Sequence, residues 1–74
     1  MALVKTMKKV VRNTKIHNEV EASYSLLKSK GVNYIQINTY GSRDRKVQGV
    51  ASQTIQLSED VINQLQAILK NEFS

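Results

Sequence analysis

The sequence predicts an α+β fold in which a three- or four-stranded antiparallel β-meander packs against one C-terminal amphipathic helix. Apolar and polar side chains alternate through residues 18–57, which is the spacing of β-strands. Apolar residues of the segment 59–72 recur instead at helical spacing. Since 74 residues allow one domain, we expect a single domain over 1–74, with the helix covering the apolar face of the sheet.

The first segment, residues 1–15, is basic and has two interpretations. It contains no acidic residue and five basic ones, which are Lys5, Lys8, Lys9, Arg12 and Lys15. Because Val10 and Val11 are β-branched and no N-cap residue precedes the segment, we expect a fourth strand near residues 5–12. A short basic helix is the alternative, because the apolar residues of this segment also fit a helical stripe.

Three strands are expected in the middle of the chain. The first lies within 18–28, and the turn that follows it contains Gly31, which can adopt a positive φ. The second strand lies within 33–41, with Ile35 and Ile37 on one face. The opposite face of this strand carries Tyr34, Gln36, Asn38 and Tyr40. A polar loop over 41–46 then leads to the third strand within 47–57.

The last segment has both the ends and the periodicity of a helix. Ser58 suits the N-cap, Glu59 and Asp60 favour the positive end of the helix dipole, and Lys70 favours the negative end. A wide apolar stripe consists of Val61, Ile62, Leu65, Ile68, Leu69 and Phe73. We predict a helix over 59–72. Because a core this small supplies little stability and the stripe is wide enough to meet a partner, we also expect a dimer or higher oligomer.

Composition argues against several classes of protein. The chain has no cysteine and one histidine, so neither a disulfide nor a Cys/His zinc site can form. Its three glycines do not form a phosphate-binding loop. We therefore expect neither an enzyme nor a cofactor or metal site. No apolar run is long enough to span a membrane and no signal peptide is present, so the expected location is cytoplasmic.

The predicted polar sheet face suggests a nucleic-acid partner. Amides and hydroxyls exchange hydrogen bonds without a charge to desolvate, and tyrosine rings can stack on bases. The net charge of +5 permits a polyanionic partner, although small basic proteins without one are common. The expected partner is single-stranded nucleic acid, and no residue pattern here distinguishes DNA from RNA. The candidate contact residues are Tyr34, Gln36, Asn38 and Tyr40 on the sheet, and Lys8, Lys9, Arg12, Arg43, Arg45 and Lys46 for phosphates.

Two stretches carry a resemblance to a known family. They are Tyr34-Ile35-Gln36-Ile37-Asn38-Thr39-Tyr40, followed by the basic loop, and Thr54-Ile55-Gln56-Leu57-Ser58-Glu59-Asp60-Val61-Ile62-Asn63-Gln64-Leu65. Over about residues 18–70 this order resembles the positive-cofactor-four family, small transcriptional coactivators that bind single-stranded DNA. The resemblance implies a homodimer paired through its C-terminal helices, with curved sheets forming the DNA channels, and it favours DNA as the nucleic-acid partner. The chain departs from the family in having no tryptophan, and in having Ser52-Gln53 in place of Lys-Gly.

Three functions from different classes remain open. The first is a single-stranded nucleic-acid-binding module. The second is a duplex-DNA-binding module that inserts a three-stranded sheet into the major groove, where Gln36, Asn38, Arg43 and Arg45 would read base edges. The third is a dimeric protein-interaction module that binds no nucleic acid.

Overall fold

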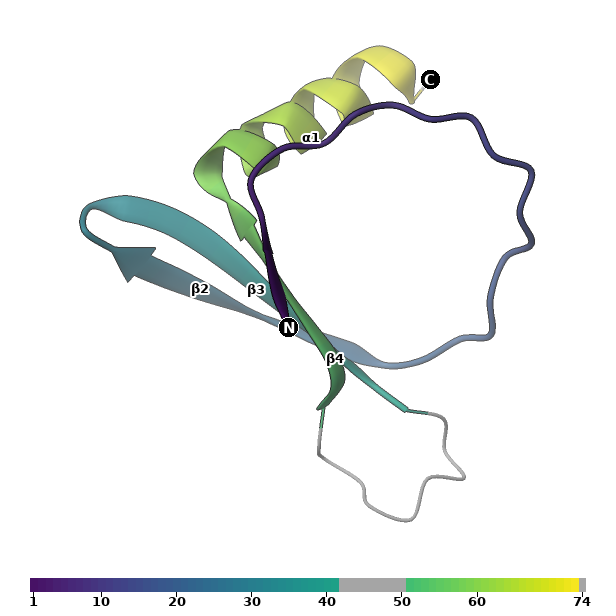
Figure 1. Ribbon diagram of the computed structural model, residues 1–74, viewed down its shortest axis with the longest axis horizontal. Helices are drawn as coiled ribbons and strands as arrows, with labels where there is room; N and C mark the ends of the chain where they lie inside the picture. The colour runs from purple at the N-terminus through teal and green to yellow at the C-terminus, as the bar shows by residue number, and fades with distance from the viewer. Residues whose placement is uncertain (42–50, 74) are drawn as a thin grey trace.

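A computed structural model describes residues 1–41 and 51–73 as a four-stranded mixed sheet followed by one helix (Figure 1). The elements are β1 (Ala2–Val4), β2 (Ala22–Ser29), β3 (Val32–Tyr40), β4 (Ala51–Ser58) and α1 (Glu59–Glu72). The strands lie in the order β1-β4-β3-β2. Since β2, β3 and β4 form an antiparallel meander and α1 packs against the sheet, the predicted α+β class is confirmed.

The N-terminal strand differs from the prediction. β1 spans Ala2–Val4 and pairs in parallel with β4, with Ala2 opposite Ile55 and Val4 opposite Leu57. Residues 5–12, where we expected a strand or a short helix, contain neither. The apolar run at the very start of the chain can lie on the sheet, whereas a strand over 5–12 would place three lysines along it.

The β2–β3 hairpin closes through a two-residue turn at Lys30-Gly31. Both residues have positive φ, 52° for Lys30 and 80° for Gly31, and Ser29 lies opposite Val32. Positive φ at both positions is characteristic of the type I′ turn, whose twist matches that of the flanking strands. The turn predicted around Gly31 is confirmed, and Lys30 adopts the left-handed conformation that Asn or Gly favours.

The strand register separates two faces of the sheet, because residues paired across a ladder lie on the same face. We call one the apolar face, and the register places on it Ala2, Val4, Ala22, Tyr24, Leu26, Ile35, Ile37, Ile55 and Leu57, together with Lys28, Asn33, Thr39 and Gln53 towards the strand ends. We call the other the polar face, and the register places on it Ser23, Ser25, Tyr34, Gln36, Asn38, Tyr40, Thr54, Gln56 and Ser58, together with the apolar residues Leu3, Leu27 and Val32. The predicted separation of Ile35 and Ile37 from Tyr34, Gln36 and Asn38 is therefore confirmed.

α1 begins where β4 ends and packs on the sheet through its first turn. The Ser58 hydroxyl accepts a hydrogen bond from the Val61 backbone N–H at 3.4 Å, as expected for the N-cap. Helix α1 contacts β3 and β4. Among the described residues, Val61 and Leu57 are the only buried hydrophobic side chains. Burying each is worth about 1.5–3 kcal/mol, so this core is small.

Beyond its first turn, α1 extends away from the strands (Figure 1). Leu65, Leu69 and Phe73 of the predicted stripe are exposed, as are Tyr24 and Leu26 on the apolar face. The helix therefore covers one end of that face and leaves the rest open. No helix in the described part of the chain is long and apolar enough to span a bilayer.

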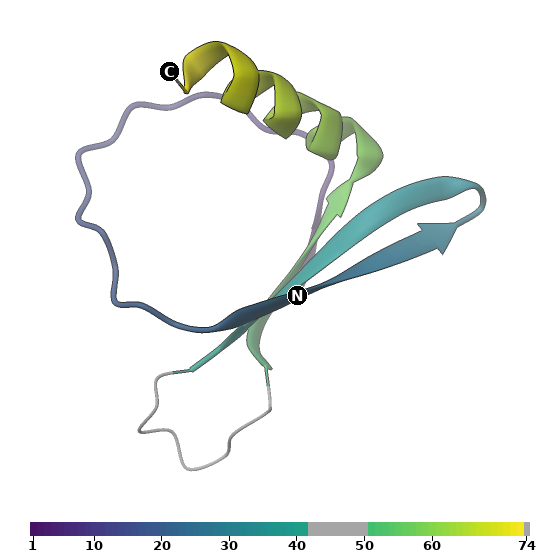
Figure 2. The same cartoon turned by 180° about the vertical axis from the view of Figure 1, so that it is seen from behind.

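Residues 5–21, which we call the N-terminal arm, contain neither helix nor strand. The arm follows α1 towards its C-terminal end and then turns back to the start of β2, so that it traces an open ring (Figure 1, Figure 2). Two contacts join it to the helix: Gln64 Nε2 donates to the Met7 carbonyl at 2.9 Å, and Lys9 Nζ lies 2.7 Å from Glu72 Oε1. The arm thus depends on α1 for its position.

Candidate nucleic-acid interface

Four uncharged side chains form a hydrogen-bonded ladder on the polar face of β3 and β4. Gln56 Nε2 donates to Gln36 Oε1 at 2.9 Å, and Gln36 Nε2 donates to Asn38 Oδ1 at 3.3 Å. Thr54 Oγ1 donates to the same Asn38 oxygen at 2.8 Å. The strand register produces these contacts, because Gln36 lies opposite Gln56 and Asn38 lies opposite Thr54. All four side chains are half-buried, so the ladder is held against the sheet.

The ladder retains hydrogen-bonding capacity for a ligand. Asn38 Oδ1 accepts two bonds, which fills its two lone pairs, whereas the Asn38 NH₂ donates to no group within residues 1–41 and 51–73. In the same part of the chain the Gln56 carbonyl oxygen accepts no bond. A ligand on this face would therefore meet two neutral donors on Asn38 and a neutral acceptor on Gln56.

Two tyrosines flank the ladder on the same strand. Tyr34 and Tyr40 are both half-buried on the polar face of β3, and six residues of strand separate their Cα atoms by about 20 Å. The Tyr40 hydroxyl is hydrogen-bonded to the Ser23 hydroxyl at 2.7 Å, which holds the ring over β2. Tyr34 pairs with Ser58 in the register and so lies at the junction of β4 and α1. The two rings therefore lie on either side of the amides of Gln36 and Asn38 along β3.

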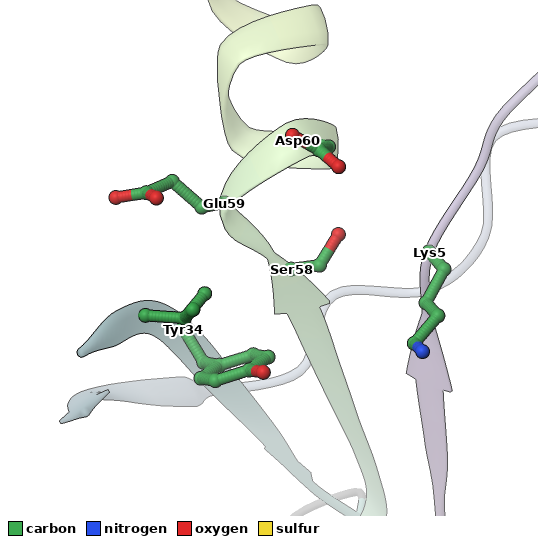
Figure 3. A pocket seen from close by; sticks show the side chains of 6 residues that line it. Lys5, Tyr34, Ser58, Glu59 and Asp60 are labelled. Atoms are coloured by element: carbon green, nitrogen blue, oxygen red, sulfur yellow. The ribbon is translucent and has the colours of Figure 1, made fainter. Parts of the chain in front are cut away.

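The Tyr34 ring also lines a pocket of about 330 Å³. The complete lining is Lys5, Val32, Tyr34, Ser58, Glu59 and Asp60. In Figure 3 the ring lies below the first turn of α1, Lys5 lies across the opening, and Glu59 and Asp60 project from that turn. Glu59 Oε1 accepts a hydrogen bond from Asn33 Nδ2 at 3.0 Å. Because two carboxylates repel a phosphate, this pocket suits an uncharged base better than the backbone of a nucleic acid.

Three of the basic residues predicted to contact phosphates lie in the described part of the chain, and these three do not lie beside the ladder. Lys8, Lys9 and Arg12 are exposed on the N-terminal arm, which runs beside α1 (Figure 1). The hydrogen bond to Glu72, together with its negative charge, raises the pKa of Lys9 above its usual value. The other three predicted phosphate contacts, Arg43, Arg45 and Lys46, lie outside the described residues.

The sequence alone predicted which sheet residues of the site share a face, but not the contacts between the strands. It identified Tyr34, Gln36, Asn38 and Tyr40 as one face, but the bonds that Thr54 and Gln56 make to β3 required the strand register. Lys5, which lines the pocket, was not among the predicted site residues. Among the described residues, no group of three or more His, Cys, Asp or Glu side chains is arranged to hold a metal ion.

Comparisons with known proteins add no assignment. No protein-family model, curated protein or solved structure matches this chain. The resemblance to the positive-cofactor-four family therefore stays a prediction. The case for a function depends on the geometry of the polar face and on the charge of the chain.

Proposed function

We propose that this chain binds single-stranded nucleic acid, with DNA favoured, on the polar face of its sheet. The observation that carries the proposal is the amide and hydroxyl ladder of β3 and β4, flanked on the same face by Tyr34 and Tyr40. Unpaired bases offer both a π-face for stacking and free edges for hydrogen bonds, and this surface presents a partner for each.

The charge distribution supports the same ligand. The polar face of β3 and β4 carries no charged side chain in the described residues, although lysine and glutamate are common on a merely solvated face. A base can therefore approach without displacing water from an ion. The net charge of +5 supplies attraction to phosphates, and Lys8, Lys9 and Arg12 lie on the N-terminal arm outside this face.

Duplex recognition is less well supported by the ladder. An Asn that reads adenine must donate to N7 and accept from the N6 amino group at the same time. Asn38 Oδ1 already accepts from Gln36 and Thr54, so only its NH₂ is available. Bidentate reading of a base pair by Asn38 would require the ladder to break.

Fluorescence anisotropy tests the proposal directly. A labelled oligonucleotide would be offered as single-stranded DNA, duplex DNA and single-stranded RNA, each at low and moderate salt. We expect single-stranded DNA to bind most tightly. If about three to five phosphates are neutralised, its log–log salt slope should be roughly −2 to −3.5. Failure to bind any of the three at low salt would refute the proposal and favour a protein-interaction module.

Tyrosine variants locate the binding to the polar face. A base stacked on an aromatic ring is worth about 1–3 kcal/mol, so Tyr34→Ala and Tyr40→Ala should each lower affinity about five- to hundredfold. The salt slope should hardly change, since no charge is lost. Tyr40→Phe is the matched control, because it keeps the ring and removes only the hydroxyl bonded to Ser23. Parental affinity in both alanine variants would contradict the stacking role.

A further inference from the structure

The chain leaves two apolar surfaces open on the same molecule. On edge strand β2, Tyr24 and Leu26 of the apolar face are each 74% exposed. On α1, Leu65, Leu69 and Phe73 are exposed along the helix stripe. α1 contacts β3 and β4 and covers the end of the sheet near Leu57. Side chains of this kind favour burial, and the fold of one copy does not supply it.

The accessible surface of the chain is larger than that of a compact monomer of the same mass. The chain has 7032 Å² of accessible surface, whereas a compact monomer of 8.4 kDa would have about 4,600 Å². Its radius of gyration is 14.6 Å, against about 11 Å for a compact domain of 74 residues. The excess is about 2,400 Å² per chain, or about 4,800 Å² for a pair, and it includes the exposed N-terminal arm as well as the open apolar surfaces. Obligate homodimers bury about 2,000–5,000 Å² in total.

We infer that a second copy of this chain covers the apolar face of the sheet together with the α1 stripe. A two-fold pair needs one surface that is complementary to itself, and an open apolar face beside an open apolar helix stripe meets that need. The sheet-and-helix interface differs from pairing through the helices alone, because it buries Tyr24 and Leu26 on β2. It also turns the two polar faces away from each other, so that both stay accessible.

The N-terminal arm provides further surface of the same kind. Val11 and Ile16 are almost fully exposed on the arm, and apart from Met7 every residue of the arm is exposed. Its basic residues can pair with acidic residues of α1, as Lys9 does with Glu72 within one copy. A second copy lying against α1 would therefore meet both the apolar and the basic side chains of the arm.

Two adjacent leucines make a matched test. Leu26 lies on the apolar face and is 74% exposed, whereas Leu27 lies on the polar face and is 37% exposed. In a lone chain, Leu27→Lys would be the more damaging change, because Leu27 is the more buried of the two. In the inferred dimer the order reverses, since Leu26 lies in the interface and Leu27 does not.

Sedimentation equilibrium and thermal unfolding of the full chain, without nucleic acid, distinguish a lone chain from the inferred dimer. We expect the parent protein and Leu27→Lys to have twice the chain mass of 8.4 kDa, with a Tm that rises with protein concentration. Leu26→Lys should weaken association at least tenfold. A parent protein that is a folded 8.4 kDa monomer at high micromolar concentration, or a Leu27→Lys variant that dissociates while Leu26→Lys does not, would overturn the inference.

Cysteine variants keep the inference testable if Leu26→Lys fails to fold. The chain contains no cysteine, so Leu26→Cys and Leu27→Cys each introduce a single thiol. At high protein concentration Leu26→Cys should react with a thiol reagent at least tenfold more slowly than Leu27→Cys, and dilution should remove the difference. A dimer in which Leu26→Cys reacts as fast as Leu27→Cys would refute the sheet interface. Because no nucleic acid is present, these outcomes are independent of the proposed binding function.

Discussion

Asn38→Asp tests the ladder with almost no change in shape. Aspartate keeps the Oδ1 position that accepts from Thr54 at 2.8 Å and from Gln36 at 3.3 Å. The substitution replaces the NH₂ with a second oxygen and adds one negative charge. Stronger hydrogen bonds to a charged acceptor offset the cost of a half-buried carboxylate, so the free energy of unfolding should change by no more than about 1 kcal/mol.

The effect on binding should be much larger than the effect on folding. A carboxylate about 6 Å from a phosphate is repelled by about 0.7 kcal/mol at the dielectric constant of water and by about 2.8 kcal/mol at an effective value of 20. Because the polar face is half-buried, its effective dielectric constant lies between these two values. The affinity for single-stranded DNA should therefore fall about three- to hundredfold, and the loss of the Asn38 donors adds to it.

Asn63→Asp is the matched control for net charge. Asn63 is exposed on α1, away from the apolar stripe, and its substitution changes the formal charge by the same amount. Anisotropy titrations should show a large loss for Asn38→Asp and a small one for Asn63→Asp, with the gap narrowing as salt screens the added charge. Equal losses in the two variants, or no loss for Asn38→Asp, would show that the polar face is not the binding surface.

Three further changes test the turn, the helix cap and the basic loop. Lys30→Asn should raise the free energy of unfolding by up to about 1 kcal/mol in calorimetry, because Asn tolerates the positive φ of 52° better than Lys; a lower Tm would contradict the turn type. Ser58→Ala should cost about 0.5–2 kcal/mol in urea unfolding, since it removes the acceptor for the Val61 N–H; an unchanged midpoint would show that the cap contributes nothing. Reversing the charge of all three basic loop residues should weaken binding to every sequence about equally and reduce the salt slope by about 2 units. An unchanged slope would exclude phosphate contacts by the loop. These residues are Arg43, Arg45 and Lys46.

Local features of the fold were predictable because each depends on near neighbours in the sequence. The alternation around Ile35 and Gln36 follows from strand geometry, so the two faces could be assigned before any strand was paired. The α1 helix from Ser58 onwards has its cap, its first-turn acids and its stripe within one short segment. The four sheet residues of the candidate site, Tyr34, Gln36, Asn38 and Tyr40, belong to the same category.

Features that join distant segments were decided by tertiary structure. The parallel pairing of Ala2–Val4 with β4 links residues more than 50 positions apart, and no local pattern near the N-terminus specifies it. The bonds from Gln56 and Thr54 to β3 exist because the hairpin register brings these side chains together. How much of the apolar face α1 covers depends on the angle at which the helix leaves β4. Periodicity determines which side of a segment is apolar, whereas the partner of that side is determined by packing in three dimensions.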